Sequence, residues 1–155
     1  MANSYEVILQ QVAETDLLAL LKVLERNSQA FAGLTISEDF GGEGLVAINE
    51  GLIDAVIAYE GEVCLMERLY GFKVSEEISL PLVLLRVVKY KGGVDVELSF
   101  NDVSCFDINC VMLAMRIYSV FLSGRFHIKE FYGGLEPAMD VDTRYFTGNT
   151  LGPLG

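Results

Sequence analysis

The 155-residue sequence has no tryptophan and only one histidine, His127. Histidine is the usual acid or base at neutral pH, so a single copy leaves little room for a catalytic triad. His127 lies between Phe126 and Ile128, a context that favours a packed or solvent-edge role. The G-x-S-x-G elbow, the P-loop and the G-x-G-x-x-G fingerprint are also missing. The sequence therefore predicts a protein that is not an enzyme.

Basic residues are missing between Arg26 and Arg68, although acidic residues are frequent there. These acids are Glu38, Asp39, Glu43, Glu50, Asp54, Glu60, Glu62 and Glu67. Acidic charge without internal partners must be solvated, bind a cation or face a basic molecule. We predict that the segment forms a contact surface for a basic partner. The predicted partner-binding residues are Glu38, Asp39, Glu43, Glu50, Asp54, Glu60 and Glu62.

The formal net charge of −11 has the same implication for the whole chain. Such a surface repels nucleic-acid phosphates and anionic lipid, so neither is expected as a partner. A basic protein, a polyamine or metal ions fit the charge, and acidity for solubility alone is the alternative. Hydrophobic residues make up 52% of the chain, which excludes a disordered protein and predicts a core.

Targeting signals and long apolar runs are lacking as well. The first residues have no basic flank or apolar stretch of a secretory signal. No apolar run reaches the ~20 residues that span a bilayer. Cys64, Cys105 and Cys110 have no metal-type spacing and fit free thiols in a reducing compartment. We expect a soluble, cytoplasmic protein.

The first half of the chain gives mixed secondary-structure signals. Leucines recur at helical spacing, which predicts a helix over residues 4–26. A break in this helix is possible near Thr15. Residues 33–44 form a glycine-rich acidic loop. Apolar runs between Leu45 and Phe72, punctuated by Gly51 and Gly61, favour a meander of strands. A helix over 51–59 is the alternative, because a short apolar run fits either a helix or a strand.

The second half is clearer. Apolar residues alternate with others over 78–84 and 94–100 around Gly92-Gly93, which predicts an antiparallel hairpin. Ser104 and Asp107 resemble a capping box, and Gly124 suits a C-cap. They predict a helix near 105–122, apolar nearly all round, which must be covered by the sheet and first helix or by a second copy. Residues 126–132 form a last strand.

These elements predict an α+β fold: a single domain over 1–132, with a mainly antiparallel sheet packed against an N-terminal helix and the strongly apolar helix. Residues 133–155 have no periodicity and are expected to be an extended tail. Tyr145 and Phe146 are candidates to anchor this tail on the body.

No cofactor or metal site is predicted. The acids of the 38–43 loop, with Asp140 and Asp142, do not match the spacing of calcium loops. Carboxylate pairs for glycoside hydrolysis cannot be singled out, and the stacking tryptophan of sugar sites is missing. Arg86, Lys89 and Lys91 form a basic cluster, interpreted as lysines that protect an edge strand, with an anion contact as the alternative.

The favoured function is a non-enzymatic protein-binding module. Small, acidic, single-domain chains without catalytic motifs are similar in type to the immunity proteins of bacterial competition systems, which implies a cytosolic inhibitor that neutralises a basic toxin. The order of elements over 4–123 also resembles the small acidic dimeric chaperones of type III secretion, which implies an unfolded client and a homodimer through 105–122. The contrasting hypothesis is a small enzyme or ligand carrier with an apolar pocket lined by Met66, Met112, Met115 and Phe121.

Overall fold

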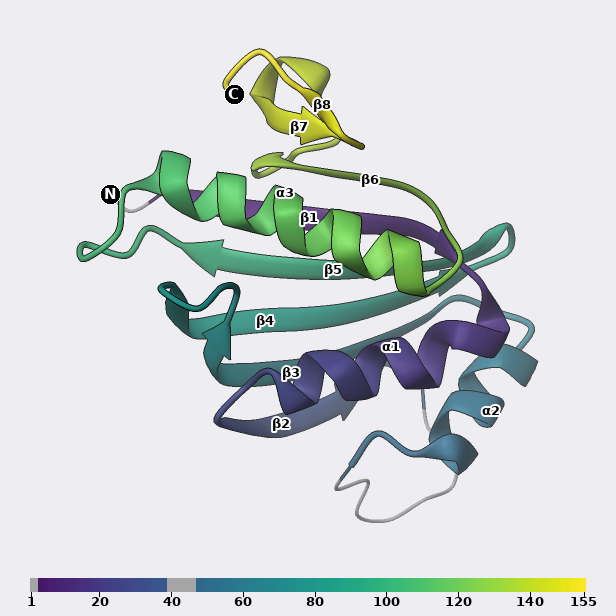
Figure 1. Cartoon of the computed structure of the whole chain (residues 1–155). Helices are drawn as coiled ribbons and strands as arrows, with labels where there is room; N and C mark the ends of the chain where they lie inside the picture. Colours follow the sequence, from purple (N-terminus) through teal and green to yellow (C-terminus); the bar gives the residue numbers. More distant parts are fainter. Residues whose placement is uncertain (1–2, 39–46) are drawn as a thin grey trace.

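The computed structural model describes residues 3–38 and 47–155, which form one antiparallel sheet with helices packed against it (Figure 1). In chain order the elements are β1 (Ser4–Val12), α1 (Glu14–Arg26), β2 (Ala30–Ile36), α2 (Glu50–Ala58), β3 (Val63–Lys73), β4 (Ser79–Tyr90), β5 (Gly93–Asn101), α3 (Ile108–Arg125), β6 (Ile128–Leu135), a 3-10 turn (Val141–Thr143), β7 (Arg144–Thr147) and β8 (Thr150–Leu151).

The eight described strands are ordered β2-β3-β4-β5-β1-β6-β7-β8, and every neighbouring pair is antiparallel. The predicted α+β fold with a mainly antiparallel sheet is therefore confirmed. The predicted hairpin is β4–β5, in which Leu85 pairs with Leu98 and Val87 with Val96. The alternation of apolar and polar residues that predicted this hairpin separates its buried face from its more solvent-exposed face.

The predicted helix over 4–26 is wrong in its first half, which is strand β1. Between β5 and β6, β1 is a central strand, and its inward residues Tyr5, Val7 and Leu9 are buried. Ile8 points to the other face, where Tyr132 and Ala138 cover it. Because apolar residues occupy both faces, the alternation typical of a half-buried strand is hidden. The helix, α1, begins at Glu14.

The segment 33–72 differs from the prediction in two places. Strand β2 continues to Ile36, into the expected loop. Residues 52–59, preferred as a strand, lie mostly in helix α2, so the helix alternative is correct. The Asn49 side chain caps this helix by accepting a hydrogen bond from the Leu52 amide at 2.9 Å. The expected strand over 63–70 is confirmed as β3.

The apolar helix is present but shifted along the chain. It begins at Ile108, capped by Asp107, whose carboxylate accepts from the Asn109 amide at 3.0 Å. Ser104 therefore does not cap it. Gly124 lies inside the helix, which ends at Arg125.

Residues 133–155 carry regular structure of their own. Strand β6 runs through residue 132 to Leu135, and β7 and β8 extend the sheet beyond it. Phe146 is buried against the body and Tyr145 is partly buried, as expected for anchoring residues. This segment is therefore part of the sheet.

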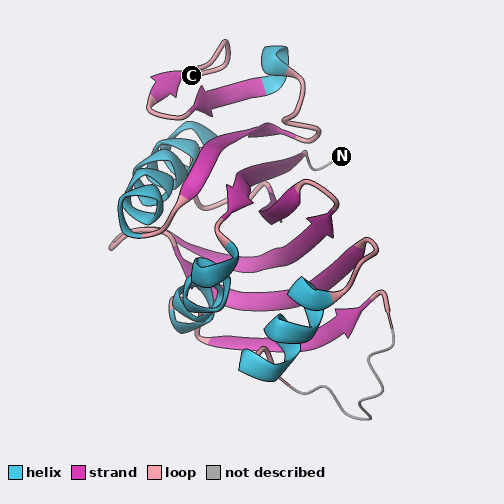
Figure 2. Ribbon diagram, turned by 90° about the vertical axis from the view of Figure 1, so that its right-hand side faces the viewer, coloured by secondary structure: helices cyan, strands magenta, loops and turns pink. Residues whose placement is uncertain are grey.

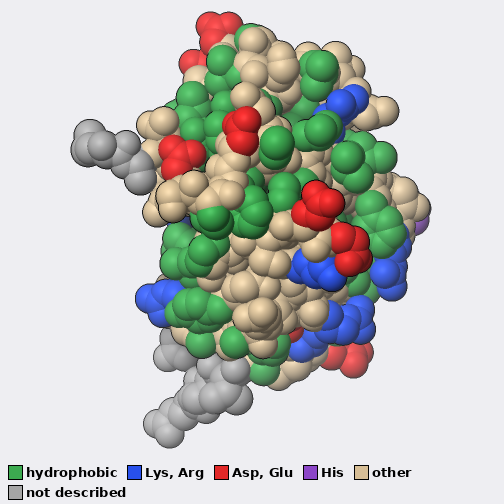
Figure 3. All heavy atoms as spheres, turned by 60° about the vertical axis from the view of Figure 1, so that its left-hand side comes forward, with side chains coloured by type: hydrophobic (Ala, Val, Ile, Leu, Met, Phe, Trp, Pro, Cys, Tyr) green, Lys and Arg blue, Asp and Glu red, His purple; other side chains and the backbone are tan. Residues whose placement is uncertain are grey.

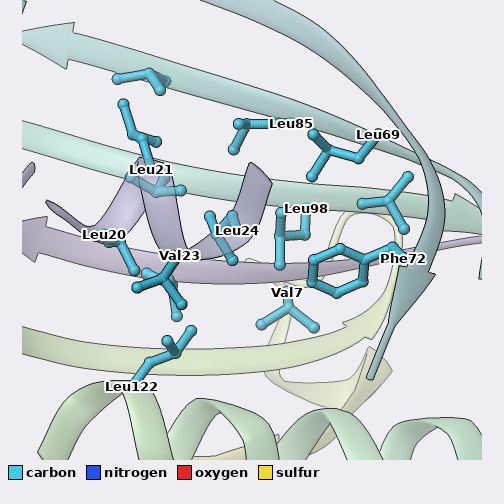
Figure 4. Packing of buried hydrophobic residues seen from close by; sticks show 14 of the residues in the cluster. Val7, Leu20, Leu21, Val23, Leu24, Leu69, Phe72, Leu85, Leu98 and Leu122 are labelled. Carbon is cyan, nitrogen blue, oxygen red and sulfur yellow. The ribbon is translucent and has the colours of Figure 1, made fainter. Parts of the chain in front are cut away.

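Helices α1 and α3 lie side by side on one face of the sheet (Figure 2). Leucines of α1 point into the same interior as Leu69, Phe72 and Leu98 from the strands (Figure 4). Asn27, which follows α1, donates a hydrogen bond to the Tyr118 hydroxyl of α3, and burial raises the pKa of this tyrosine to about 12. Among the described residues, none of the helices combines the length and apolarity needed to cross a membrane.

Candidate functional site

The acidic surface expected from the sequence gathers around α2. The helix buries Leu52, Ile53 and Val56 in the core. Glu50 and Asp54, one turn apart, lie on its exposed side. The spacing of apolar and acidic residues therefore turns the carboxylates of α2 outward.

Three more predicted residues lie near the ends of the neighbouring elements. Glu60 and Glu62 are exposed in the turn between α2 and β3. Glu38 follows β2, and its carboxylate raises the pKa of the Tyr59 hydroxyl at the end of α2. The other two predicted residues, Asp39 and Glu43, lie outside the described residues.

Glu67, the last acid of the same segment, does not reach this surface. It points inward between Leu65 and Leu69 of β3 and meets Glu25 of α1. Glu25 and Glu67 are each only 2% exposed, and the Lys22 Nζ lies 3.2 Å from the Glu25 Oε1. One oxygen of each carboxyl has no hydrogen-bond partner among the described residues. The position of Glu67 in the alternating β3 pattern was the signal that could have predicted its burial.

A second surface feature is an apolar ridge on α3, defined by Leu113, Ile117, Val120 and Phe121. The opposite side of the helix is buried against the sheet, so the expectation that the helix is covered on most sides is wrong for the isolated chain. Figure 3 shows hydrophobic side chains reaching the surface in several places between charged ones. Apolar patches on a soluble protein commonly mark binding surfaces.

Grooves flank this ridge on both sides. One, of about 580 Å³, lies between α3 and the turn that joins β3 to β4, with Val74, Ile78 and Tyr118 in its lining and Glu76 and Glu77 at the same turn. The other lies beside Arg116 and Asn149. The Arg116 guanidinium donates to the Asn149 carbonyl at 2.7 Å, which holds it along this side.

The expected apolar pocket is not assembled. Met112 and Met115 are core residues of α3, and Phe121 is exposed on the ridge. Met66, which alternates with the buried residues of β3, is only partly buried. These four side chains do not line a common cavity among those found in the described part of the chain.

The groups considered for chemistry have structural roles. His127 is 90% exposed in its side chain, and its Nδ1 lies 2.9 Å from an Asp16 carboxylate oxygen. The hydrogen bond from the His127 amide, and then this side-chain contact, lower the pKa of Asp16. Asp140 caps the 3-10 turn by accepting from the Asp142 amide at 3.2 Å. Within residues 3–38 and 47–155, no three His, Cys, Asp or Glu side chains are placed to hold a metal ion.

Contrary to the sequence-based prediction, the basic cluster is not placed on an edge strand. It lies on and just beyond β4, which is flanked by β3 and β5 and is not an edge strand. Arg86 pairs with Glu97 on β5 at 3.5 Å. Burial raises the pKa of Glu97, and the arginine charge opposes that effect. The edge-strand interpretation is therefore wrong for Arg86 and Lys89.

Comparisons with known proteins identify relatives of this chain. Residues 3–151 match the family described as PABL017 Cdi1I immunity protein. The chain is also 41% identical to a chain of a crystal structure described as the toxic C-terminal tip of CdiA from Pseudomonas aeruginosa in complex with immune protein. That match covers 100% of both chains with a TM-score of 0.94. A search of curated proteins gives no match. Of the two binding-protein resemblances found in the sequence, the family match favours the immunity proteins.

Proposed function

Because the chain belongs to the PABL017 Cdi1I immunity protein family, we propose that it neutralises a CdiA-type toxin by binding its toxic C-terminal tip. The observation that carries this proposal is the 41% identity along the whole of both chains to a chain of a structure that holds such a tip with its immune protein. An immunity protein and its toxin tip form a pair, so the partner is expected to be the tip made by the same host.

Neutralisation is proposed to be a binding event without a reaction. The imidazole of the exposed His127 contacts the Asp16 carboxylate, and the three cysteines are free thiols. Neither arrangement supplies an activated nucleophile with a base and an orienting group. We propose that the chain acts in the cytoplasm, where free thiols persist and where a toxin would reach its target.

The proposed toxin contact is the acidic surface around α2. Its described members are Glu38, Glu50, Asp54, Glu60 and Glu62, and Asp39 and Glu43 belong to the segment that connects β2 to α2. A basic tip would be attracted to this surface over several ångströms, which raises the association rate and selects against acidic partners. The apolar face of α2 is packed in the core, so the carboxylates are presented from a fixed support.

Neutralising the acids of α2 and the following turn is expected to weaken binding of the tip by about 10- to 100-fold at low salt. The variant carries Glu50→Gln, Asp54→Asn, Glu60→Gln and Glu62→Gln. Lost charge attraction slows association, so the salt dependence of the affinity should also flatten. Association and dissociation rates, measured for immobilised tip at two salt concentrations, test both effects.

A matched variant with the same change in net charge controls for acidity in general. It carries Glu77→Gln, Asp102→Asn, Glu136→Gln and Asp142→Asn, which are exposed acids outside the proposed surface. This variant should bind the tip almost as tightly as the wild type. Equal weakening by both variants would mean that net charge matters and this surface does not. Unchanged binding by the first variant would show that the acidic surface is not part of the toxin interface.

A further inference from the structure

The face of the sheet that points away from the helices is only half covered. The apolar residues of α1, α2 and α3 belong to the core on the helix side. On the other side, the segment around Ala138 lies over β1 and β6, and the Ala138 amide donates to the Glu6 carboxylate at 2.7 Å. Over β3 and β4 the same face is accessible, because Tyr70 is 39% and Leu82 is 41% exposed.

The accessible half, named the open face below, has an unusual composition. Leu65, Glu67 and Leu69 of β3 point to the core, so the residues in alternate positions point away from it. The open face consists of Met66, Arg68 and Tyr70 of β3, their partners Arg86, Leu84 and Leu82 of β4, and Ala30 and Ala32 of β2. None of these residues is Lys, Asp or Glu, although the chain has 22 Asp and Glu residues. The centres of protein interfaces are likewise enriched in Tyr, Met and Arg and depleted in Lys, Asp and Glu.

Arg68 differs from the other arginine of the open face because its charge is not balanced. Arg86 lies 3.5 Å from Glu97, whereas Arg68 makes no ion pair with a carboxylate of the described residues. The Arg68 guanidinium lies over Gly33, where a Cβ would come within 2.6 Å of its Nη1 atom. A guanidinium presents a planar set of donors that fits a carboxylate. Arginine and tyrosine are also the residues that most often dominate the energy of protein interfaces.

From these observations we propose that the open face is the centre of the toxin interface, with Arg68 and Tyr70 as its anchors and the acidic surface around α2 as its rim. This inference rests on the proposed neutralisation of a toxin tip. The two surfaces are continuous along β3, because a strand rises about 3.3 Å per residue and Arg68 therefore lies about 20 Å from Glu62. A standard interface of about 800 Å² per partner is roughly 30 Å across. One bound tip can therefore reach both surfaces.

Charge favours the toxin tip over a second copy as the occupant of the open face. Two copies with a formal net charge of −11 each repel one another, and such charge keeps a protein monomeric. A basic tip is attracted by the acidic rim, and one carboxylate of the tip satisfies Arg68. A hollow of about 130 Å³ at the border of the open face, lined in part by Leu82, Leu84 and Glu136, can receive a side chain of the tip.

Replacing Arg68 by glutamine tests the proposal by the sign of its effect. The variant makes the chain more acidic, so long-range attraction alone would leave binding of a basic tip equal or slightly tighter. The proposal instead predicts that the dissociation constant rises about 30-fold, mainly through faster dissociation. Arg68→Lys keeps the charge without the planar donors and should lose most of the same affinity. Arg125→Gln removes the same charge at the end of α3, on the helix side, and should bind like the wild type.

Tyr70→Ala removes the second anchor and is also expected to weaken binding of the tip about 30-fold. The matched control is Phe121→Ala, which removes an aromatic ring that is 54% exposed on α3, on the helix side of the sheet. This control should bind the tip as tightly as the wild type. Rates measured with immobilised tip give the affinities, and unchanged circular dichroism would show that all the variants fold.

Tight binding by the wild type, Arg68→Gln and Tyr70→Ala alike would overturn this inference and leave toxin neutralisation intact. Weaker binding by Phe121→Ala with unchanged binding by Tyr70→Ala would overturn it as well, by placing the interface on the helix side. Sedimentation equilibrium of the chain alone should give the single-chain mass of 17.1 kDa at micromolar concentration. A dimer that Tyr70→Ala dissociates would show that a second copy occupies the open face. A wild-type chain that does not bind the tip would contradict the proposed function, and this inference with it.

Discussion

Replacing Glu67 by glutamine is expected to stabilise the folded chain at alkaline pH and to change it little at acid pH. Glu67 lies at the buried contact between β3 and α1, where it shares a hydrogen bond with Glu25. Burial, and then the hydrogen bond and charge of Glu25, raise the pKa of Glu67 to about 8. Glutamine keeps the shape of the side chain and can donate to Glu25 without ionising.

The sign of the pH dependence follows from the raised pKa. Between its usual value of 4.5 and about 8, the folded chain retains a proton on Glu67 that the unfolded chain has released. The stabilisation from Glu67 is therefore complete below this window and is lost as pH rises through it. Burial also raises the pKa values of Glu6 and Glu97, which add slopes of the same sign. The difference between the wild type and Glu67→Gln isolates the contribution of Glu67.

Urea denaturation between about pH 4.5 and pH 9 measures this difference. We expect Glu67→Gln to exceed the wild type by roughly 2 kcal/mol in free energy of unfolding above pH 8. The two should converge near the acid end. The exposed Glu77→Gln is the control and should follow the wild type throughout. Parallel curves for wild type and Glu67→Gln would show that Glu67 does not take up a proton on folding.

Replacing Gly134 by alanine is expected to disrupt the C-terminal strands, with a loss of about 3 kcal/mol in free energy of unfolding. A Cβ at this position would overlap the Thr143 carbonyl oxygen and lie 2.7 Å from the Arg144 Cα. Both contacts are to backbone, and the pairing of β6 with β7 shifts register at this point. The strands must therefore separate, and cannot relieve the overlap by turning a side chain.

Thermal or urea unfolding measures the loss, and hydrogen exchange of the β7 amides locates it. The matched control is Gly124→Ala on α3, where an added Cβ meets no atom within 4 Å. That change should stabilise the helix by about 1 kcal/mol, because alanine favours helix over glycine. If Gly134→Ala is as stable as the wild type with unchanged exchange of β7, the close approach of the two backbones is not needed.

The strands that could be predicted are those with one buried face and one solvent-exposed face. The β4–β5 hairpin was predicted because its inward residues alternate with polar ones around a glycine turn. Strand β1 was missed because Ile8, on its outer face, is covered by Tyr132 and Ala138. Burial on both faces removes the alternation, and the leucines of α1 follow directly. For α2, the length of the apolar run could not distinguish helix from strand.

The same reasoning explains what could be learned about the site. Glu60 and Glu62 could be predicted to face solvent because they lie at a turn between two apolar runs. Glu67 was not among the predicted contact residues, but its buried contact with Glu25, which is far away in sequence, could not be predicted. The apolarity of α3 was evident, yet only the structure shows that one side remains uncovered.

Titration of the toxin tip with the purified chain tests the central claim most directly. If the chain neutralises the tip by binding alone, toxic activity should fall in proportion to added chain and vanish at one chain per tip. Inhibition should be immediate, and the mass of the tip should be unchanged. Inactivation by far less than one chain per tip, increasing with time, would contradict the claim by showing that the chain acts on the tip as an enzyme. Full toxic activity in excess chain would contradict neutralisation itself.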